Sequence, residues 1–423
     1  MEYTESEVLQ YIAENDVKFI KLFFTDIFGA IKSISIQPGE LKKAFKDGIS
    51  FDASAVKGFL EASRSDLFIV PDPSTLSVLP WRPQHGRVVR FFCNVRNADG
   101  TPFEGDSRYI LQKTAASAEK LGYELQIGTE CEFYLFQVDE KGEPTKIPQD
   151  TAGYCDLAPR DKGENVRRDI CLTLIQMDII PEMSHHETGP GQQEVDFKYD
   201  TLLKAADNLG TFKTVVKTIA ARNGLYASFM PKPLADKAGS GLHINISLKK
   251  NGHNIFDNDK LPADAKSFIA GILYRIRDIT AFLNPLNNSY ERFGAYEAPK
   301  YISWSSQNRS QLIRIPAEKG ERKRLELRSP DPSCNQYLAL SLIVEAGLEG
   351  ISQKRELAPS KDINLFNASK EELAGLETLP VSLNDALKLA AKSSFVKSVL
   401  PAATLKGFTE MKTSSDDPSF EEI

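Results

Sequence analysis

The stretch GTECEFYLF (residues 128–136) decides how the chain folds and indicates what it does. Glu130 and Glu132 fall on one side of an extended strand, and the apolar residues between them fall on the other. This follows because successive side chains of a β-strand point to opposite faces of its sheet. We therefore expect a sheet with one face packed on the core and one face that carries carboxylates.

Three further segments show a related pattern. Polar and aliphatic residues alternate in LHINISL (242–248) and in RLELR (324–328), and carboxylates follow the histidine pair in SHHETGPGQQEVDF (184–197). The polar positions of these segments are His243, Asn245, Ser247, Arg324, Glu326, Arg328, Glu187 and Glu194. A single strand of this kind is typical of a solvated sheet face. The whole set favours a polar face that lines a cavity, because the many expected helices would otherwise cover it.

Carboxylates brought together from neighbouring strands repel one another, and burial makes that repulsion costly unless cations lie between them. Oxygen ligands with a single imidazole suit Mg²⁺ or Mn²⁺ better than a metal that prefers sulfur. The pattern therefore predicts a divalent cation site on the polar face.

Arginines are clustered in the C-terminal half of the chain. The candidates are Arg292, Arg309, Arg314, Arg324 and Arg328. Guanidinium groups bind phosphate and carboxylate through paired hydrogen bonds. Cations combined with arginines are typical of a phosphoryl-transfer site, although a basic surface strip is the alternative interpretation. The sequence contains neither a P-loop nor a G-x-G-x-x-G motif.

Composition excludes several other classes of protein. The chain has 423 residues, with 52 Lys and Arg against 58 Asp and Glu, which gives a formal charge of −6. An acidic chain without a long basic run is poorly suited to nucleic acids or anionic membranes. No apolar run approaches the roughly 18 residues of a membrane helix. Five scattered cysteines without a C-x-x-C pair argue against a disulfide framework or a zinc site. We expect a cytoplasmic protein.

The pattern along the chain divides it into a small, mostly β unit (1–102) and a larger unit of helices and strands (103–423). The predicted strands lie within 17–37, around a Phe28-Gly29 turn, and at 88–95, 124–136, 226–230 and 242–248. The predicted helices are 41–47, 108–121, 165–177, 203–223, 265–283, 336–350 and 385–399. We expect the passage 70–83 to be extended or looped because it is rich in proline. The polar tail 412–423 is expected to fray.

The sequence resembles one known family over most of its length, from about residue 16 to 400. The matching runs are FDASAVKGF (51–59), DPSTLSVLPW (72–81), GTECEFYLF (128–136), SHHETGPGQQEVDF (184–197), FMPKPLADKAGSGLHINISL (229–248), NNSYERFGAYEAP (287–299) and NRSQLIRIPAEKGERKRLELRSPDPS (308–333). In this order they resemble bacterial type I glutamine synthetase. The resemblance implies an α+β fold: an N-terminal β-grasp domain and a catalytic domain with a curved antiparallel sheet covered by helices.

The resemblance also implies an activity. Family members join L-glutamate and ammonium to L-glutamine with ATP, through γ-glutamyl phosphate, and use two or more Mg²⁺ or Mn²⁺ ions per active site. They belong to the ligases of nitrogen metabolism and glutamine biosynthesis. Their subunits form a hexameric ring, which in some members stacks into a dodecamer, and neighbouring subunits share the active sites.

The family's site residues can be carried over position by position. The implied metal ligands are Glu132, Glu187 and Glu194 for one ion, and Glu130, His243 and Glu326 for the other. The implied substrate contacts are Tyr154, Glu187, Gly239, Arg292 and Arg328. The implied nucleotide contacts are Glu182, Asn245, Ser247, Arg314 and Arg324. The implied catalytic residues are Asp52, contributed by a neighbouring subunit, Arg309 and the flap residue Glu297.

The chain departs from the family pattern near the amine site. The usual D-G-S-S is Asp52-Ala53-Ser54-Ala55, an expected Asn is Ala238, the flap before Glu297 is one residue shorter, and the C-terminal tail ends early. These differences leave three hypotheses open: a glutamine synthetase, a γ-glutamylamide ligase that uses a larger amine, and a non-catalytic binding protein. The short tail predicts weak stacking of rings.

Overall fold

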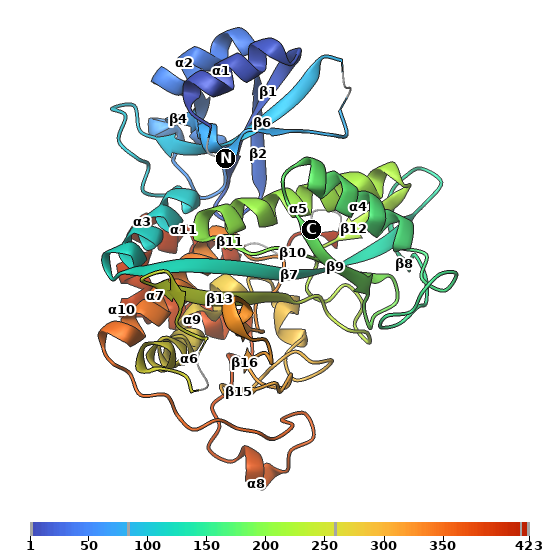
Figure 1. Cartoon of the computed structure of the whole chain (residues 1–423), viewed down its shortest axis with the longest axis vertical. Coiled ribbons are helices and arrows are strands. Elements are labelled where there is room, and N and C mark those ends of the chain that lie inside the picture. The colour runs from blue at the N-terminus through green and yellow to red at the C-terminus, as the bar shows by residue number, and fades with distance from the viewer. Residues whose placement is uncertain (1–2, 83–84, 258–259, 415–416, 421–423) are drawn as a thin grey trace.

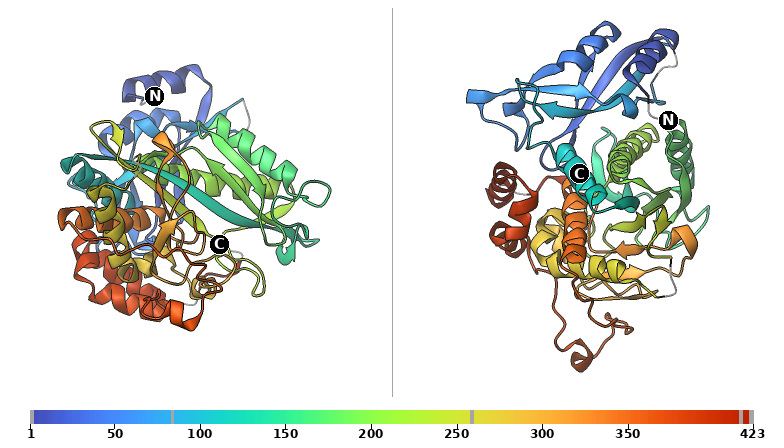
Figure 2. Two further views of the ribbon diagram at one scale, coloured as in Figure 1. Left: turned by 60° about the horizontal axis from the view of Figure 1, so that its bottom comes forward. Right: turned by 60° about the vertical axis from the view of Figure 1, so that its left-hand side comes forward.

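The computed structural model describes residues 3–82, 85–257, 260–414 and 417–420. A small N-terminal unit sits at one end of a larger unit, as Figures 1 and 2 show from three sides. The predicted boundary at residue 102 lies in the link between the last strand of the small unit and the first helix of the large one. The division of the chain into two domains at residue 102 stays a prediction.

The small unit is built on a sheet with the strand order β2-β1-β6-β4-β3, with β5 beside β6. Its elements are α1 (Glu5–Glu14), β1 (Val17–Thr25), β2 (Ile31–Ile36), α2 (Leu41–Asp47), β3 (Ile49–Asp52), β4 (Asp66–Pro71), β5 (Ser77–Val78) and β6 (Arg87–Arg96). The hairpin turn forms because the Asp26 carboxylate accepts hydrogen bonds from the backbone N–H groups of Phe28 and Ala30. The predicted strands and helix of this region are confirmed, and the structure adds α1, β3, β4 and β5, which were not predicted.

The large unit is organised by a sheet in the order β15-β16-β17-β13-β7-β10-β9, with short strands beside β7 and β13. Its strands are β7 (Tyr123–Val138), β8 (Pro144–Pro148), β9 (Pro181–His186), β10 (Gln192–Phe197), β11 (Asp200–Thr201), β12 (Leu225–Ser228), β13 (Leu242–Lys250), β14 (His253–Asn254), β15 (Trp304–Ser306), β16 (Ile313–Ile315) and β17 (Leu325–Leu327). The sheet is mixed rather than antiparallel throughout, because β15 pairs with β16 in parallel.

Helices cover the apolar face of this sheet (Figure 1). They are α3 (Ser107–Lys120), α4 (Glu164–Gln176), α5 (Leu202–Arg222), α6 (Ala263–Leu283), α7 (Gln336–Ser352), α9 (Leu383–Lys392), α10 (Ser394–Val399) and α11 (Ala402–Ser414). The short helix α8 (Lys370–Leu373) has no buried residue and lies apart from the sheet, at the bottom of Figure 1. Phe133 on β7 and Ile244 on β13 are fully buried in one core with Phe212 of α5. The apolar half of each alternating strand thus faces the helices, as predicted, and leaves the polar half for the other face.

Two predictions near the C-terminus are wrong. The single helix expected over 385–399 is two helices, because Ser393 leaves the helical conformation and its hydroxyl caps α10 by accepting from the Val396 N–H. The described part of the predicted frayed tail is ordered into α11 and, further on, into a contact with the large sheet: the ring of Phe420 lies 5.0 Å from that of Phe136. Residues 415–416 and 421–423 of the predicted tail, and residue 83 of the predicted proline-rich passage, lie outside the described residues.

Two findings agree with the composition. The five cysteines are free thiols. Among the described helices, we find none with the length and apolar character that a membrane crossing requires.

A buried charge cluster joins the two units. Arg108 on α3 forms ion pairs with Asp207 on α5, at 2.9 Å, and with Asp72 of the small unit, at 2.8 Å. It also donates to the side chain of Asn94 on β6, at 2.7 Å. Arg108 is 3% exposed, so these partners replace nearly all of its hydration. The cluster therefore fixes how the small unit sits on the large one.

We predict that Arg108→Leu lowers the free energy of unfolding by about 3–5 kcal/mol, because the buried Asp207 and the partly buried Asp72 lose their counter-charge. Lys113→Leu on the same helix is the matched control: its pair with Glu104 is exposed, and we expect a loss of about 0–1 kcal/mol. Urea unfolding followed by circular dichroism measures both. Equal effects of the two substitutions would contradict the role given to Arg108.

Candidate functional site

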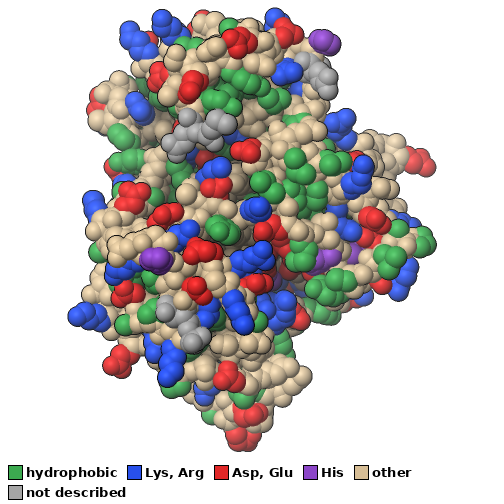
Figure 3. Space-filling model, viewed as in Figure 1, with side chains coloured by type: hydrophobic (Ala, Val, Ile, Leu, Met, Phe, Trp, Pro, Cys, Tyr) green, Lys and Arg blue, Asp and Glu red, His purple; other side chains and the backbone are tan. Residues whose placement is uncertain are grey.

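The polar face of the large sheet lines a cavity of about 750 Å³. Charged residues of both signs and histidines surround it, and Figure 3 shows such side chains gathered on this face of the molecule. Of the predicted site residues, those that line the cavity are Glu130, Glu132, Tyr154, Glu187, Glu194, Gly239, His243, Arg292, Glu297, Arg309, Arg314, Arg324 and Arg328. Most of the predicted residues are therefore brought together by the fold.

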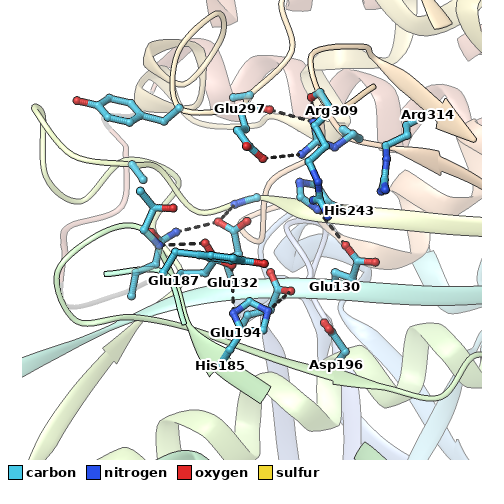
Figure 4. Close-up of a pocket in the computed structure, with 18 of the residues that line it drawn as sticks. Glu130, Glu132, His185, Glu187, Glu194, Asp196, His243, Glu297, Arg309 and Arg314 are labelled. Carbon is cyan, nitrogen blue, oxygen red and sulfur yellow. Dashed lines mark hydrogen bonds and ion pairs between the residues drawn. The ribbon is translucent and has the colours of Figure 1, made fainter. Parts of the chain in front are cut away.

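Strand register explains why the carboxylates meet. Glu132 on β7 lies directly opposite Glu194 on β10, and Glu130 lies opposite His243 on β13. Glu326 on β17 lies opposite Asn245, also on β13. Paired residues share a sheet face, so four neighbouring strands direct their ligand-type side chains into one space (Figure 4).

The first ligand group consists of Glu130, His243 and Glu326, whose ligand atoms lie within 4.8 Å of one another. His243 Nδ1 is 3.1 Å from Glu130 Oε2 and 3.7 Å from Glu326 Oε1. Burial alone would raise the pKa of Glu130, but its hydrogen bonds with His243 and Asn245, and the nearby imidazole charge, lower that pKa to about 2. Glu130 is therefore an anion at neutral pH.

The second group consists of Glu132, Glu187 and Glu194. Glu132 accepts from Gln192 Nε2 at 2.8 Å and from the Gly241 N–H at 2.9 Å, which fixes its carboxylate. Burial and the charge of Glu132 raise the pKa of Glu187 to about 7. Burial, together with the same neighbouring charge, raises the pKa of Glu194 well above its usual range. These three side chains cannot all be anions at neutral pH without added positive charge.

Arginines neutralise the opposite wall of the cavity. Glu326 accepts from Arg314 at 2.5 Å and from Arg328 Nε at 3.0 Å. Arg328 is 1% exposed and also approaches the Glu297 carboxylate, at 3.7 Å. The buried Arg292 donates to the backbone carbonyls of Ser329 and Pro330. This wall presents fixed guanidinium groups suited to anionic substrates.

Two loops reach the cavity because they contain glycine. A Cβ atom at Gly189 would lie 1.9 Å from the Tyr134 hydroxyl. A Cβ atom at Gly239 would lie 2.5 Å from the Pro231 carbonyl oxygen and 2.6 Å from Arg292 Cγ. Any side chain at either position would push the loop, and with it Glu187 or Arg292, out of place.

Five predicted residues do not line the cavity. Glu326 is 1% exposed and pairs with Arg314 and Arg328, which do line it. Asn245 and Ser247 are buried on β13; Asn245 donates to Glu130 and accepts from Arg324, at 2.9 and 2.8 Å, so it acts behind the cavity wall. Glu182 is exposed on β9, one residue from Met183, which does line the cavity, so alternation directs it to the other face. The exposed Asp52 ends β3 in the small unit. Hydrogen bonds from Ser54 lower its pKa.

Sequence reasoning missed His185 and Asp196, which both line the cavity. The same alternation contained the signal, because Asp196 follows Glu194 by two residues and His185 precedes Glu187 by two. Burial and the neighbouring Glu194 and Glu130 raise the pKa of Asp196 to about 9. The carboxylate array is thus larger than predicted.

Comparison with known proteins agrees with this geometry. Residues 16–98 match the family "Glutamine synthetase, beta-Grasp domain", and residues 104–422 match "Glutamine synthetase, catalytic domain". The chain belongs to the glutamine synthetase family. The family resemblance, the α+β fold and its two component folds are thereby confirmed.

Relatives and solved structures support the assignment. The chain is 47% identical to a glutamine synthetase of Clostridium saccharobutylicum, over 94% of this chain and 91% of the relative. It is 48% identical to one of Methanosarcina mazei, over 94% and 90%. Among solved structures, "GmaS/ADP complex-Conformation 1" matches with a TM-score of 0.88 and 30% identity, over 98% of this chain and 95% of that one. A Plasmodium falciparum glutamine synthetase matches with a TM-score of 0.86 and 25% identity, over 97% and 95%.

The glutamine synthetase family uses ATP and divalent metals, and the ligand groups fit such ions. Hard carboxylate oxygens with one imidazole are the donors that Mg²⁺ and Mn²⁺ accept. Burial and the neighbouring carboxylates raise the pKa values of Glu187 and Glu194, and a bound cation would relieve this repulsion. The donor chemistry and the electrostatics of these side chains therefore both favour divalent cations.

We predict that divalent cation binding to the metal-stripped protein releases protons and weakens below pH 7. A cation must displace the proton from Glu187, whose pKa is about 7, so apparent affinity falls about tenfold per pH unit below it for each displaced proton. Calorimetry in buffers of different ionisation enthalpy measures the release. Glu187→Gln should reduce it by up to one proton, whereas the exposed Glu164→Gln should not. Constant affinity between pH 6 and 8 would contradict the arrangement.

Proposed function

We propose that the chain joins L-glutamate and ammonium to L-glutamine in this cavity, with ATP converted to ADP and phosphate. Membership of the family makes it a glutamine synthetase, an ATP-dependent ligase of nitrogen metabolism. The observation that carries the proposed site is the meeting of two carboxylate groups with buried arginines in one cavity. Transfer of a phosphoryl group from ATP to a carboxylate needs cations, which the carboxylates of the cavity can hold. It also needs arginines that bind the anionic substrates.

We place one divalent cation at Glu132, Glu187 and Glu194, and a second at Glu130, His243 and Glu326. Bound Mg²⁺ or Mn²⁺ would supply charge neutralisation for the nucleotide phosphates and the transferred phosphoryl group. The remaining proposed nucleotide contacts are Glu182, Asn245, Ser247, Arg314 and Arg324. Asn245 supports this wall indirectly, since its amide holds Glu130 and its carbonyl oxygen holds Arg324.

In the first step, arginines bind and orient glutamate. Arg292 and Arg328 are proposed to hold its carboxylates, with backbone contacts from Gly239. A γ-carboxylate oxygen attacks the γ-phosphorus of ATP, the bond to ADP breaks, and γ-glutamyl phosphate forms. Arg309 and Arg314 stabilise the negative charge that is transferred. The step is needed because a free carboxylate has no leaving group that an amine can displace.

In the second step, ammonia replaces phosphate. Ammonium loses a proton to an acidic pocket, proposed to comprise Tyr154, Glu187, Glu297 and Asp52 of a neighbouring subunit. The nitrogen then attacks the acyl carbon, the carbon–oxygen bond to phosphate breaks, and the nitrogen's extra proton leaves with the phosphate to give the amide. Glu297 has a positive φ of 65° and a side chain that is 62% exposed. We propose that its flap closes over the intermediate and excludes water.

The proposal predicts phosphate release that depends on ATP, glutamate and Mg²⁺ and saturates with ammonium. Glu326→Gln should abolish it, because a cation ligand is lost and the partners Arg314 and Arg328 lose their counter-charge. Glu321→Gln, an exposed carboxylate nearby, should leave it unchanged. Turnover only with methylamine or a larger amine would instead assign a γ-glutamylamide ligase, and no release with any amine would favour a binding protein.

We further propose a hexameric ring in which subunits share their active sites. The position of Asp52 supports this, since it lies on the small unit and outside its own chain's cavity. Symmetric rings bring the same two surfaces together at every interface. Asp52 of one subunit can then serve the cavity of the next.

Co-expression tests the shared site. Asp52→Ala and Glu326→Gln should each be inactive, whereas their mixed rings should regain about a quarter of the wild-type activity, because half of the catalytic units are intact and half of those adjoin an intact Asp52. Asp52→Ala co-expressed with the double variant is the control and should stay inactive. Full activity of Asp52→Ala alone, or no recovery in mixed rings, would contradict the shared site.

A further inference from the structure

Asp196 is a cavity carboxylate that has no part in the proposed reaction. It lies on β10 two residues after Glu194, and Figure 4 shows it on the same face as Glu194 and Glu130. The residue is 8% exposed, and its Oδ1 atom has no hydrogen-bond partner among the described residues. A buried carboxyl oxygen without a partner costs free energy, and a bound cation would supply the missing contact.

The neighbours of Asp196 supply further donors. His185 on β9 lies directly opposite Glu194, with its Nε2 atom 3.5 Å from Glu194 Oε1. Three ligand atoms, one from each of His185, Glu194 and Asp196, lie within 4.8 Å of one another. Oxygen and nitrogen ligands lie about 2.0–2.6 Å from a divalent cation, so two ligands of one ion are at most about 5 Å apart. A single ion can therefore contact all three side chains.

Charge balance also favours an ion here. Glu132 lies opposite Glu194, so Asp196 adds a further carboxylate next to an existing pair on adjacent strands. Like charges at such positions destabilise a sheet. Neither of the two cation positions proposed above includes Asp196 as a ligand. An ion at either of those two positions would therefore leave the Asp196 carboxyl group without a cation of its own.

We propose that His185, Glu194 and Asp196 form a third divalent cation site. It lies beside the position proposed at Glu132, Glu187 and Glu194, and the Glu194 carboxylate bridges the two. Two carboxylates with one imidazole suit Mn²⁺, which accepts both oxygen and nitrogen donors. The inference rests on the proposed function only through the cation ligand role of Glu194.

Counting bound Mn²⁺ tests the site directly. The assembled, metal-stripped protein is dialysed against Mn²⁺ alone, and bound ions per subunit are measured by electron paramagnetic resonance. We expect Asp196→Asn to bind one ion fewer per subunit than the wild type. Asp200→Asn is the matched control: Asp200 pairs with Lys204 on the same stretch of chain but outside the cavity lining, and its count should equal that of the wild type.

A second variant keeps the test decisive if Asp196→Asn fails to fold. His185→Gln should lose the same single ion, and the double variant should lose no more than either alone. An unchanged count in both variants would overturn the site and leave Asp196 as a hydrogen-bonding neighbour of Glu194. Loss of every bound ion in either variant would also overturn it, because that residue would then act by positioning shared ligands. The count needs no ATP, glutamate or ammonium, so it is independent of whether the chain makes glutamine.

Discussion

Mutual repulsion among carboxylates on one buried sheet face is the constraint on which the rest of the structure depends. Strand register places Glu132 opposite Glu194, and burial raises the pKa of the latter well above its usual range. The fold meets this constraint on one side with Arg314 and Arg328, which pair with Glu326. On the other side it leaves oxygen donors for cations. The same charge distribution that is costly in the metal-free chain suits a site that must hold nucleotide phosphates.

The framework around this face is built to keep it rigid. The apolar half of every alternating strand packs under helices, so a strand cannot slip by one residue without burying carboxylates in the core. Glycines at 189 and 239 let two loops approach where a side chain would collide. The buried Arg108 cluster fixes the small unit on the large one and thereby fixes the direction in which Asp52 projects. Packing, loop geometry and domain attachment therefore all help to hold the charged side chains of the cavity and Asp52 in place.

Much of this was predictable from local pattern, and the exceptions have physical reasons. Alternation predicted the face of Glu130 and Glu132 because strand geometry has a period of two. The same rule applies to Asp196, but the family resemblance implies a role only for Glu194, so Asp196 was not predicted. The parallel pairing of β15 with β16 depends on contacts between segments that no local pattern specifies. The break at Ser393 and the docking of Phe420 each depend on a single side chain, a cap in one case and a ring contact in the other.

The most direct test of the account is to locate the cations. Crystals of the protein soaked in Mn²⁺ would be measured at the manganese absorption edge, and an anomalous difference map would be calculated. The account predicts peaks at Glu132, Glu187 and Glu194 and at Glu130, His243 and Glu326, within coordination distance of the carboxylate oxygens. A map without peaks between these side chains, in crystals that show Mn²⁺ bound elsewhere, would contradict the claim that cations balance the buried carboxylates.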